Sequence, residues 1–423
     1  MQEDLLQFIW QFGLFHSHRL VTTSGDSLVI IHKGNINKNA GPDFLTAKIK
    51  IGTTTLVGNI ELHLKTSDWF KHQHQKDSAF NNLILHVVYE HDVKVWPYSF
   101  PILVLKEHIS EETLKTYQEL MHQKQDIACA QLLPSVNELV KYNWQHRLLL
   151  ERWEMKLQDW RNDLVSNHND WQQLLIKRLI INFGFNINAM GFELLANAIP
   201  SKLLIKVQHN LLEMEALLFG QAGFLEDNFA DDYYLQLQLH YKFIKHKFQL
   251  QPMPKHIWKF MRMRPVNFPT IRITQLAVLL CNTSHLCAQL TEIKSLNDIR
   301  SLFKIKASTY WDNHVRFGVE TKNKSIKNLG QAAIDIIYIN TLLPFLFLHA
   351  SYEDHYEKKM LVIEWLQSIK AEQNSIIEKW TSCSWKVDNA FDSQSLLQLY
   401  NSYCLPKKCL DCAIGLSIFT LRP

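Results

Sequence analysis

The stretch GPDFLTAKIKIGTTTLVGNIELHLK (residues 41–65) decides the fold of the N-terminal part of this chain. It contains two β-rich runs, FLTAKIKI (44–51) and TTLVGNIELHLK (54–65). Runs of this composition, bounded by turn residues, are typical of strands. Only Gly52 and Thr53 separate them, and a two-residue break of this kind predicts an antiparallel hairpin.

Polar side chains follow one face of the second predicted strand. Successive strand residues point to opposite faces, so Glu61, His63 and Lys65 share a face. In a hairpin centred on the Gly52–Thr53 turn, Asp43 of the first strand comes close to Glu61. Two carboxylates can hold a divalent cation, with Lys65 near the anionic group under attack. A sheet with one solvated face would show the same alternation without any site.

The remaining sequence divides into a mixed N-terminal part and a helical part. Apolar residues at helical spacing predict a helix over the first dozen residues, and a shorter helix is expected at 68–77. Further strands are predicted at 27–34, 82–91 and 100–107. Beyond residue 109 helical patterns dominate. We therefore expect an α/β (or α+β) domain with a mixed sheet at 1–125 and a large all-α region at 126–423.

The composition is that of a globular protein, with 47% hydrophobic and 20% charged residues. The net charge of +4 over 423 residues gives only weak support for a nucleic-acid partner. The N-terminus opens with acids instead of a basic segment, so no secretory signal is expected. The longest apolar run, 336–350, contains Pro344 and is shorter than a membrane span. These features predict a cytoplasmic protein with no membrane partner.

The hairpin residues resemble the motif of the PD-(D/E)xK phosphodiesterase superfamily, through Pro42-Asp43 and Glu61. The resemblance implies a restriction-endonuclease-like core: a helix, a three-stranded meander, a helix and a further strand. It also implies that Asp43 and Glu61 bind magnesium (or manganese) and that a lysine orients the attacking water. His63 stands at the place of that lysine, and Lys65 lies on the same face two residues later. The helix acid of some members would be Glu3.

The resemblance implies a metal-dependent phosphodiesterase, a nuclease-like hydrolase acting on DNA or RNA. An alternative of another class is a non-catalytic scaffold or nucleic-acid-binding (for example DNA-binding) module that keeps the sheet without the chemistry.

A second chemistry is indicated by the histidines that follow the hairpin: His72, His74 and His86, with Asp77 among them. Imidazole suits zinc and iron better than magnesium, so these residues with Glu61 and His63 could form a zinc or iron hydrolase site. On a helix, residues two apart do not face the same way. At most one of His72 and His74 is then expected in the site, unless the stretch is a loop. The alternative for each histidine is a surface or hydrogen-bonded structural role.

The chain also resembles an uncharacterised bacterial family, domain of unknown function number twenty-eight fifty-one. The segments that carry this resemblance are NAGPDF, GNIELHLKTSDW, HQHQKD, NLILHVV and the C-terminal YCLPKKCLDCAIG. The resemblance extends over most of the chain and implies no activity.

Three of the seven cysteines cluster near the C-terminus, where Cys404, Cys409 and Cys412 give a C-x4-C-x2-C pattern. An odd number of cysteines in a long chain argues against a disulfide scaffold. Thiolates at this spacing can bind a structural zinc ion or an iron–sulfur cluster. A fourth ligand would be needed, and Cys383 is the first candidate, with a histidine as the alternative. Reduced, unliganded thiols are the other interpretation.

Overall fold

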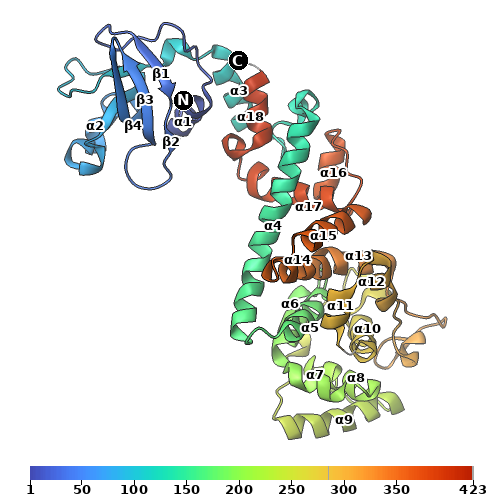
Figure 1. Cartoon of the computed structure of the whole chain (residues 1–423). Coiled ribbons are helices and arrows are strands. Elements are labelled where there is room, and N and C mark those ends of the chain that lie inside the picture. Colours follow the sequence, from blue (N-terminus) through green and yellow to red (C-terminus); the bar gives the residue numbers. More distant parts are fainter. Residues whose placement is uncertain (284, 422–423) are drawn as a thin grey trace. The chain divides into compact units, whose positions relative to one another are not determined.

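The computed structural model describes residues 1–283 and 285–421 (Figure 1). The chain divides into two compact units. The first comprises Met1–Leu148, Glu378–Lys386 and the residues from Leu396 onward, and the second comprises Leu149–Ile377 and Val387–Ser395. The C-terminal segment thus belongs to the same unit as the N-terminal sheet.

The first unit contains a mixed six-stranded sheet, as the sequence predicts. Its strands run in the order β1-β3-β4-β5-β6, with β2 paired to β3. Pairing is antiparallel among β1, β2, β3 and β4, and parallel from β4 to β5 and from β5 to β6. The strands are β1 (Leu28–His32), β2 (Asn35–Ile36), β3 (Phe44–Ile51), β4 (Thr54–Lys65), β5 (Leu83–Glu90) and β6 (Ile102–Val104).

The predicted hairpin is formed by β3 and β4. Ile51 pairs with Thr54, which leaves Gly52 and Thr53 as the two-residue turn. Gly52 has a φ of +54°, a left-handed conformation that glycine adopts at little cost. Near its other end the register shifts between Phe44 and Ala47, and Phe44 pairs with Ile60. The sequence-based hairpin prediction is confirmed.

Helices and short helical turns complete the first unit. They are α1 (Glu3–Phe12), α2 (Asp68–Lys71), α3 (Glu111–His122), α18 (Ala413–Leu421), η1 (His74–Lys76), η2 (Ser78–Phe80), η3 (Lys106–His108), η4 (Ala130–Ser135), η9 (Tyr400–Cys404) and η10 (Cys409–Asp411). Of these, η9 is a π-helical turn, and the other η elements are 3-10 turns.

Both faces of β4 are buried at the end of the strand. On one face Ile60 and Leu62 join the main core of this unit, which includes the apolar side of α1 and Phe419 of α18. On the other, a smaller aromatic cluster centred on Trp69 covers the strand, with Phe80, Leu83, Trp96, Tyr98 and Phe100. The polar face of β4 is therefore enclosed at Glu61 and His63, whereas Lys65 on the same face is exposed. At these two residues, the alternation in β4 is therefore not that of a sheet with one solvated face.

The second unit is helical around one large hydrophobic core, as expected for this region. A small two-stranded ribbon is the departure from an all-α region: β7 (His314–Arg316) and β8 (Val319–Glu320). The helical elements are α5 (Trp171–Asn182), α6 (Ala189–Ala198), α7 (Ser201–Val207), α8 (Leu211–Gln221), α9 (Asp232–Phe248), η5 (Lys255–Ile257), η6 (Pro265–Asn267), α10 (Pro269–Asn282), α11 (Leu286–Glu292), α12 (Leu296–Leu302), η7 (Thr309–Asp312), α13 (Gln331–Ile337), η8 (Tyr338–Leu342), α14 (Leu343–Tyr352) and α15 (Tyr356–Ser368).

Three further helices have residues in both units: α4 (Glu138–Ser166), α16 (Ser375–Ser382) and α17 (Ala390–Leu399). The continuous helical stretch Gln331–Tyr352 is long and apolar enough to cross a membrane by length and composition. Within the protein, 72% of its most apolar 18-residue segment is buried, which is typical of a core helix.

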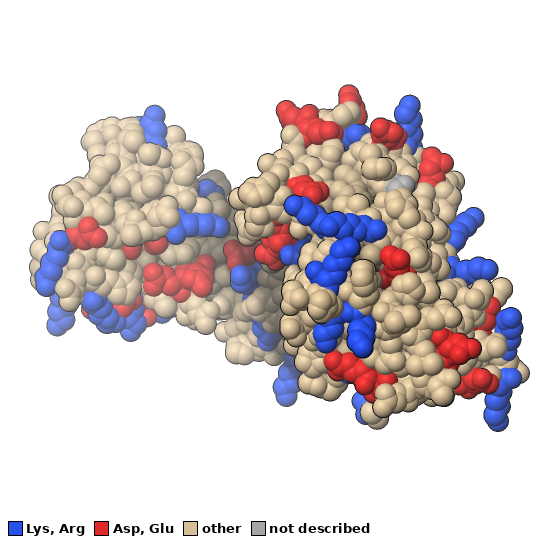
Figure 2. Space-filling model, turned by 90° about the horizontal axis from the view of Figure 1, so that it is seen from below, with Lys and Arg blue, Asp and Glu red and all other residues tan. Residues whose placement is uncertain are grey.

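Charged side chains are mixed on the surface. On the face shown in Figure 2, lysine and arginine form several small groups separated by acidic and uncharged residues. This distribution is consistent with the small net charge of +4.

Candidate metal site

Glu61 and His63 lie on the enclosed face of β4. Both are buried, with exposed fractions of 4% and 0%. Trp69 of α2 and the aromatic cluster around it keep this face of the strand from solvent. Burying a carboxylate and an imidazole is costly unless each finds partners. The neighbours of these two residues therefore define the site.

Asp43 is held directly beside Glu61, as the hairpin register requires. The Asp43 backbone N–H donates to Glu61 Oε2 over 3.0 Å, and the Leu62 N–H donates to Asp43 Oδ2 over 2.9 Å. The Gln7 side-chain amide of α1 donates to Asp43 Oδ1 over 2.9 Å. Gln7 has no signal in the sequence, because its role depends on how α1 packs against the sheet.

The acids of this region raise one another's pKa. Burial and the charge of Asp43 raise the pKa of Glu61 to about 9. Burial also raises the pKa of Asp43 to about 6, and burial with the charge of Asp43 raises that of Glu3 to about 7. Carboxylates crowded in this way are stabilised by a cation. The electrostatics thus favour a bound positive charge beside Glu61.

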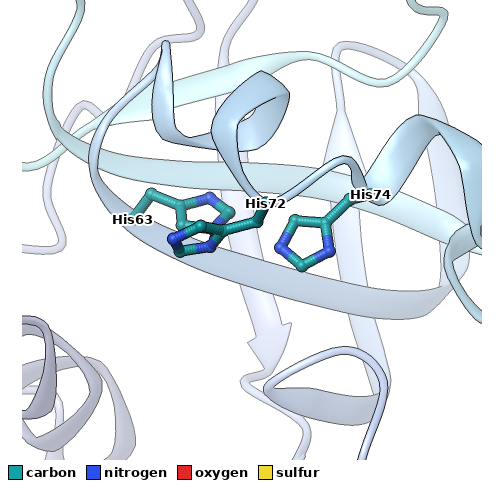
Figure 3. Close-up of side chains that lie close together, drawn as sticks. All are labelled: His63, His72 and His74. Carbon is teal, nitrogen blue, oxygen red and sulfur yellow. The ribbon is translucent and has the colours of Figure 1, made fainter.

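The segment after β4 brings both His72 and His74 to the site. The helix predicted at 68–77 is wrong, because α2 ends at Lys71 and the chain continues as the separate turn η1. Gln73 between them has a φ of +57°, in the left-handed region. Because the chain changes direction at Gln73, the two imidazoles, which a continuous helix would point to different sides, point to the same side. Figure 3 shows them converging with His63.

Ligand atoms of the three histidines lie close together, and Glu61 lies beside two of them. His63 Nε2 is 3.1 Å from His72 Nδ1 and 3.6 Å from Glu61 Oε1. His74 Nε2 is 3.3 Å from the same Glu61 Oε1. One ligand atom from each of the three histidines lies within 4.8 Å of the other two.

These separations fit a single metal ion. Nitrogen and oxygen ligands bound to zinc at roughly 2.0–2.1 Å in a tetrahedron lie about 3.4 Å apart. The three measured separations of 3.1, 3.3 and 3.6 Å bracket that value. The His72 side chain is exposed, so the site opens to solvent on its side.

His86 supports the site from beneath. It is fully buried on β5, and its Nε2 lies 2.9 Å from His63 Nδ1, the nitrogen of His63 that faces away from the other ligands. Burial and the neighbouring imidazoles lower the pKa of His63, and burial with His74 lowers that of His86 to about 3. Burial also lowers the pKa of His74. Neutral imidazole is the form that binds metal.

Two buried nitrogens of the cluster have no hydrogen-bond partner, His74 Nε2 and His86 Nδ1. Buried polar atoms normally find partners. For His74 Nε2, a metal ion between it and Glu61 would supply the missing interaction. The donor set and its geometry therefore fit a transition-metal ion.

Lys65 and Asp77 lie outside this cluster. The Lys65 side chain is exposed, and the residue's backbone N–H donates to Asp68. Asp77 is exposed and caps η2 by accepting from the Ala79 N–H over 2.9 Å. Of the sequence-predicted residues, the structure thus brings together Asp43, Glu61, His63, His72, His74 and His86.

The C-terminal cysteines gather at a different place in the first unit. Cys404, Cys409 and Cys412 line one small cavity, and Cys129 lines it with them. Cys383, the fourth residue suggested by the sequence, lines a neighbouring cavity instead.

Comparison with protein-family models matches residues 3–375 to the family described as "Protein of unknown function (DUF2851)". The chain belongs to this family, which the sequence resemblance anticipated. Neither the curated proteins nor the solved structures give a match to the chain.

Proposed function

We propose that this protein is a metal-dependent hydrolase in which His63, His72 and His74 hold one transition-metal ion beside Glu61. The observation that carries the proposal is the convergence of one nitrogen from each of the three imidazoles within 4.8 Å of the other two, with Glu61 Oε1 3.3 Å from His74 Nε2 and 3.6 Å from His63 Nε2. Three imidazoles and a carboxylate suit zinc or iron more than magnesium.

Neighbouring residues hold the side chains of this centre in place. His86 fixes the orientation of His63 through the 2.9 Å contact to Nδ1, and partners of this kind raise the affinity of a histidine ligand. The Asp43 N–H orients Glu61 by binding its Oε2, which leaves Oε1 toward the histidines. With three histidine ligands, a metal ion there would keep a position for water, whose pKa it would lower to roughly 7, and so it would supply a nucleophile at neutral pH. The exposed side of His72 is where substrate would approach.

A second candidate function is a magnesium- or manganese-dependent phosphodiesterase acting on DNA or RNA. The observation that favours it is the direct pairing of Asp43 with Glu61. The order α1, the antiparallel strands β1, β3 and β4, then α2 and the parallel strand β5, is the order expected of a restriction-endonuclease-like core. Against this candidate, His63 occupies the position of the lysine, and its ring contacts His72 and His86.

Metal analysis and one histidine variant separate the two candidates. The purified full-length chain would be analysed for zinc, iron and manganese, and then assayed on ester, amide and phosphodiester substrates with each metal. Under the first proposal His74→Ala loses both the metal and the activity, while His18→Ala, an exposed control, keeps both.

Under the phosphodiesterase proposal, cleavage of nucleic acid with magnesium is lost in Asp43→Ala and Glu61→Gln but survives His74→Ala. Metal binding without hydrolysis of any substrate would favour a non-catalytic module.

A further inference from the structure

Four cysteines from two distant parts of the sequence meet in the first unit. Cys129 precedes η4, whereas Cys404, Cys409 and Cys412 belong to the C-terminal segment. All four line one small cavity, and all four are free thiols. Free cysteines scattered as core residues have no reason to converge in this way, so their placement points to a shared ligand.

The C-terminal segment is bent closely around this cavity. Cys404 ends the π-helical turn η9, and Lys407 after it has a φ of +54°. The Lys407 ammonium donates to the Met121 and Gln123 carbonyls at the end of α3, over 2.6 and 3.1 Å. At Gly415 a side chain would meet the Cys409 carbonyl oxygen at 2.0 Å. The glycine therefore permits the approach that brings Cys409 to Cys412.

Burial raises the pKa of all four thiols, and groups beside Cys412 partly oppose this effect. Cys412 immediately precedes α18, and the backbone N–H groups of Ile414 and Gly415 point at its thiol. A helix N-terminus stabilises a thiolate. The buried Trp144 indole N–H lies beside Cys412 and has no partner of standard hydrogen-bond geometry. Lys408 adds a cation to the cavity wall.

The spacing of the sulfurs excludes a single zinc ion as their common ligand. Thiolates bound to one zinc at roughly 2.3 Å can be at most about 4.6 Å apart. Among residues 1–283 and 285–421, no three cysteine sulfurs lie within 4.8 Å of one another. The four thiols are thus spread more widely than the ligands of one ion, and a cluster with several metal atoms spreads its thiolate ligands in this manner.

We propose that Cys129, Cys404, Cys409 and Cys412 ligate an iron–sulfur cluster. The pattern C-x4-C-x2-C with a distant fourth cysteine is one that such clusters use. Cys129 is the fourth ligand because it lines the same cavity, whereas Cys383 lines another. This cluster is separate from the histidine site and does not depend on the proposed hydrolase activity.

The test is metal analysis of the full-length chain purified without oxygen. We expect iron and acid-labile sulfide in equal amounts, at the stoichiometry of a [2Fe–2S] or a [4Fe–4S] cluster, together with visible absorbance. Cys129→Ser and Cys412→Ser should lose at least 80% of both elements, roughly a fivefold fall, because four-cysteine ligation is broken. Cys383→Ser is the matched control and should keep them.

Zinc without sulfide, or no metal after reconstitution with iron and sulfide, would overturn the proposal. A cluster retained in Cys129→Ser but lost in Cys383→Ser would also overturn the assignment of the fourth ligand. If the Cys129 variant does not fold, the iron and sulfide content of the unmodified chain and of Cys383→Ser still decides the outcome.

Discussion

The histidine site and the cysteine cavity lie in the same unit but are built in different ways. The histidine site takes its residues from β4 and the segment that follows, residues 61–74, and opens to solvent at His72. The cysteine cavity joins residue 129 to residues 404–412 and is lined mostly by apolar atoms. An open site can admit a substrate, whereas a closed one that ties distant segments together stabilises the fold. Under the two proposals, the histidine region would serve chemistry and the cysteine region would stabilise the fold.

The largest effect should come from Gly415→Ala in the cysteine region. The new Cβ would lie 2.0 Å from the Cys409 carbonyl oxygen, so backbone must move. We expect a loss of roughly 3–4 kcal/mol in the free energy of unfolding, measured by urea titration with tryptophan fluorescence. The control is Gly330→Ala, where a Cβ meets nothing within 4 Å. Unchanged stability in Gly415→Ala would contradict a stabilising role of the cysteine region, because this region would then not depend on its close packing.

The second effect belongs to the histidine region and should spare the fold. His74→Ala removes one of three proposed histidine ligands, and we expect metal affinity and hydrolysis to fall about 100-fold, near 2.7 kcal/mol. The free energy of unfolding of the metal-free chain should change by less than about 1 kcal/mol, since His74 is only half-buried. Competition titration against a chromophoric chelator measures the affinity. Global unfolding of this variant would contradict the view that the histidine region contributes little to the stability of the fold.

A smaller effect is expected at His86. Among the residues of the site, its hydrogen-bond contact is with His63. His86→Gln should weaken metal binding about 10-fold, because changes to such supporting partners typically cost 10–100-fold. The same chelator titration checks this, with His18→Gln as the exposed control. An affinity equal to that of the unmodified chain would mean that His63 is oriented without His86.

The smallest effect is expected at Lys65. Its side chain is exposed, so Lys65→Ala should change the rate of hydrolysis by less than about 3-fold and stability by less than about 0.5 kcal/mol. Initial rates at saturating metal test this. A fall in the rate of 100-fold or more would show that Lys65 has the role of the motif lysine. This result would favour the phosphodiesterase proposal.

The sequence predicted the hairpin and the meeting of Asp43 with Glu61, because both follow from local alternation and a two-residue turn. It did not predict that His72 and His74 lie together beside His63. Their convergence depends on the left-handed conformation of Gln73, a residue type with no strong preference for it.

Contacts between distant segments were also out of reach. Nothing local to Cys129 or Gln7 signals which residues they meet, since those contacts depend on the packing of α1 and the return of the C-terminal segment. The fold class was therefore more predictable than the composition of either site.

The membership of the C-terminal segment in the first unit sets the order in which that unit can be completed. The core that contains β3, β4 and α1 also contains Phe419, whose ring lies 5.2 Å from that of Phe8. On a ribosome, the strands emerge long before α18, and the whole second unit is made in between. From Val104 at the end of β6 to Ala413 at the start of α18, at roughly 5–20 residues per second, the interval is about 15–60 s. During that time the N-terminal sheet has an uncovered apolar patch, which makes this half of the nascent chain the part that chaperones would protect.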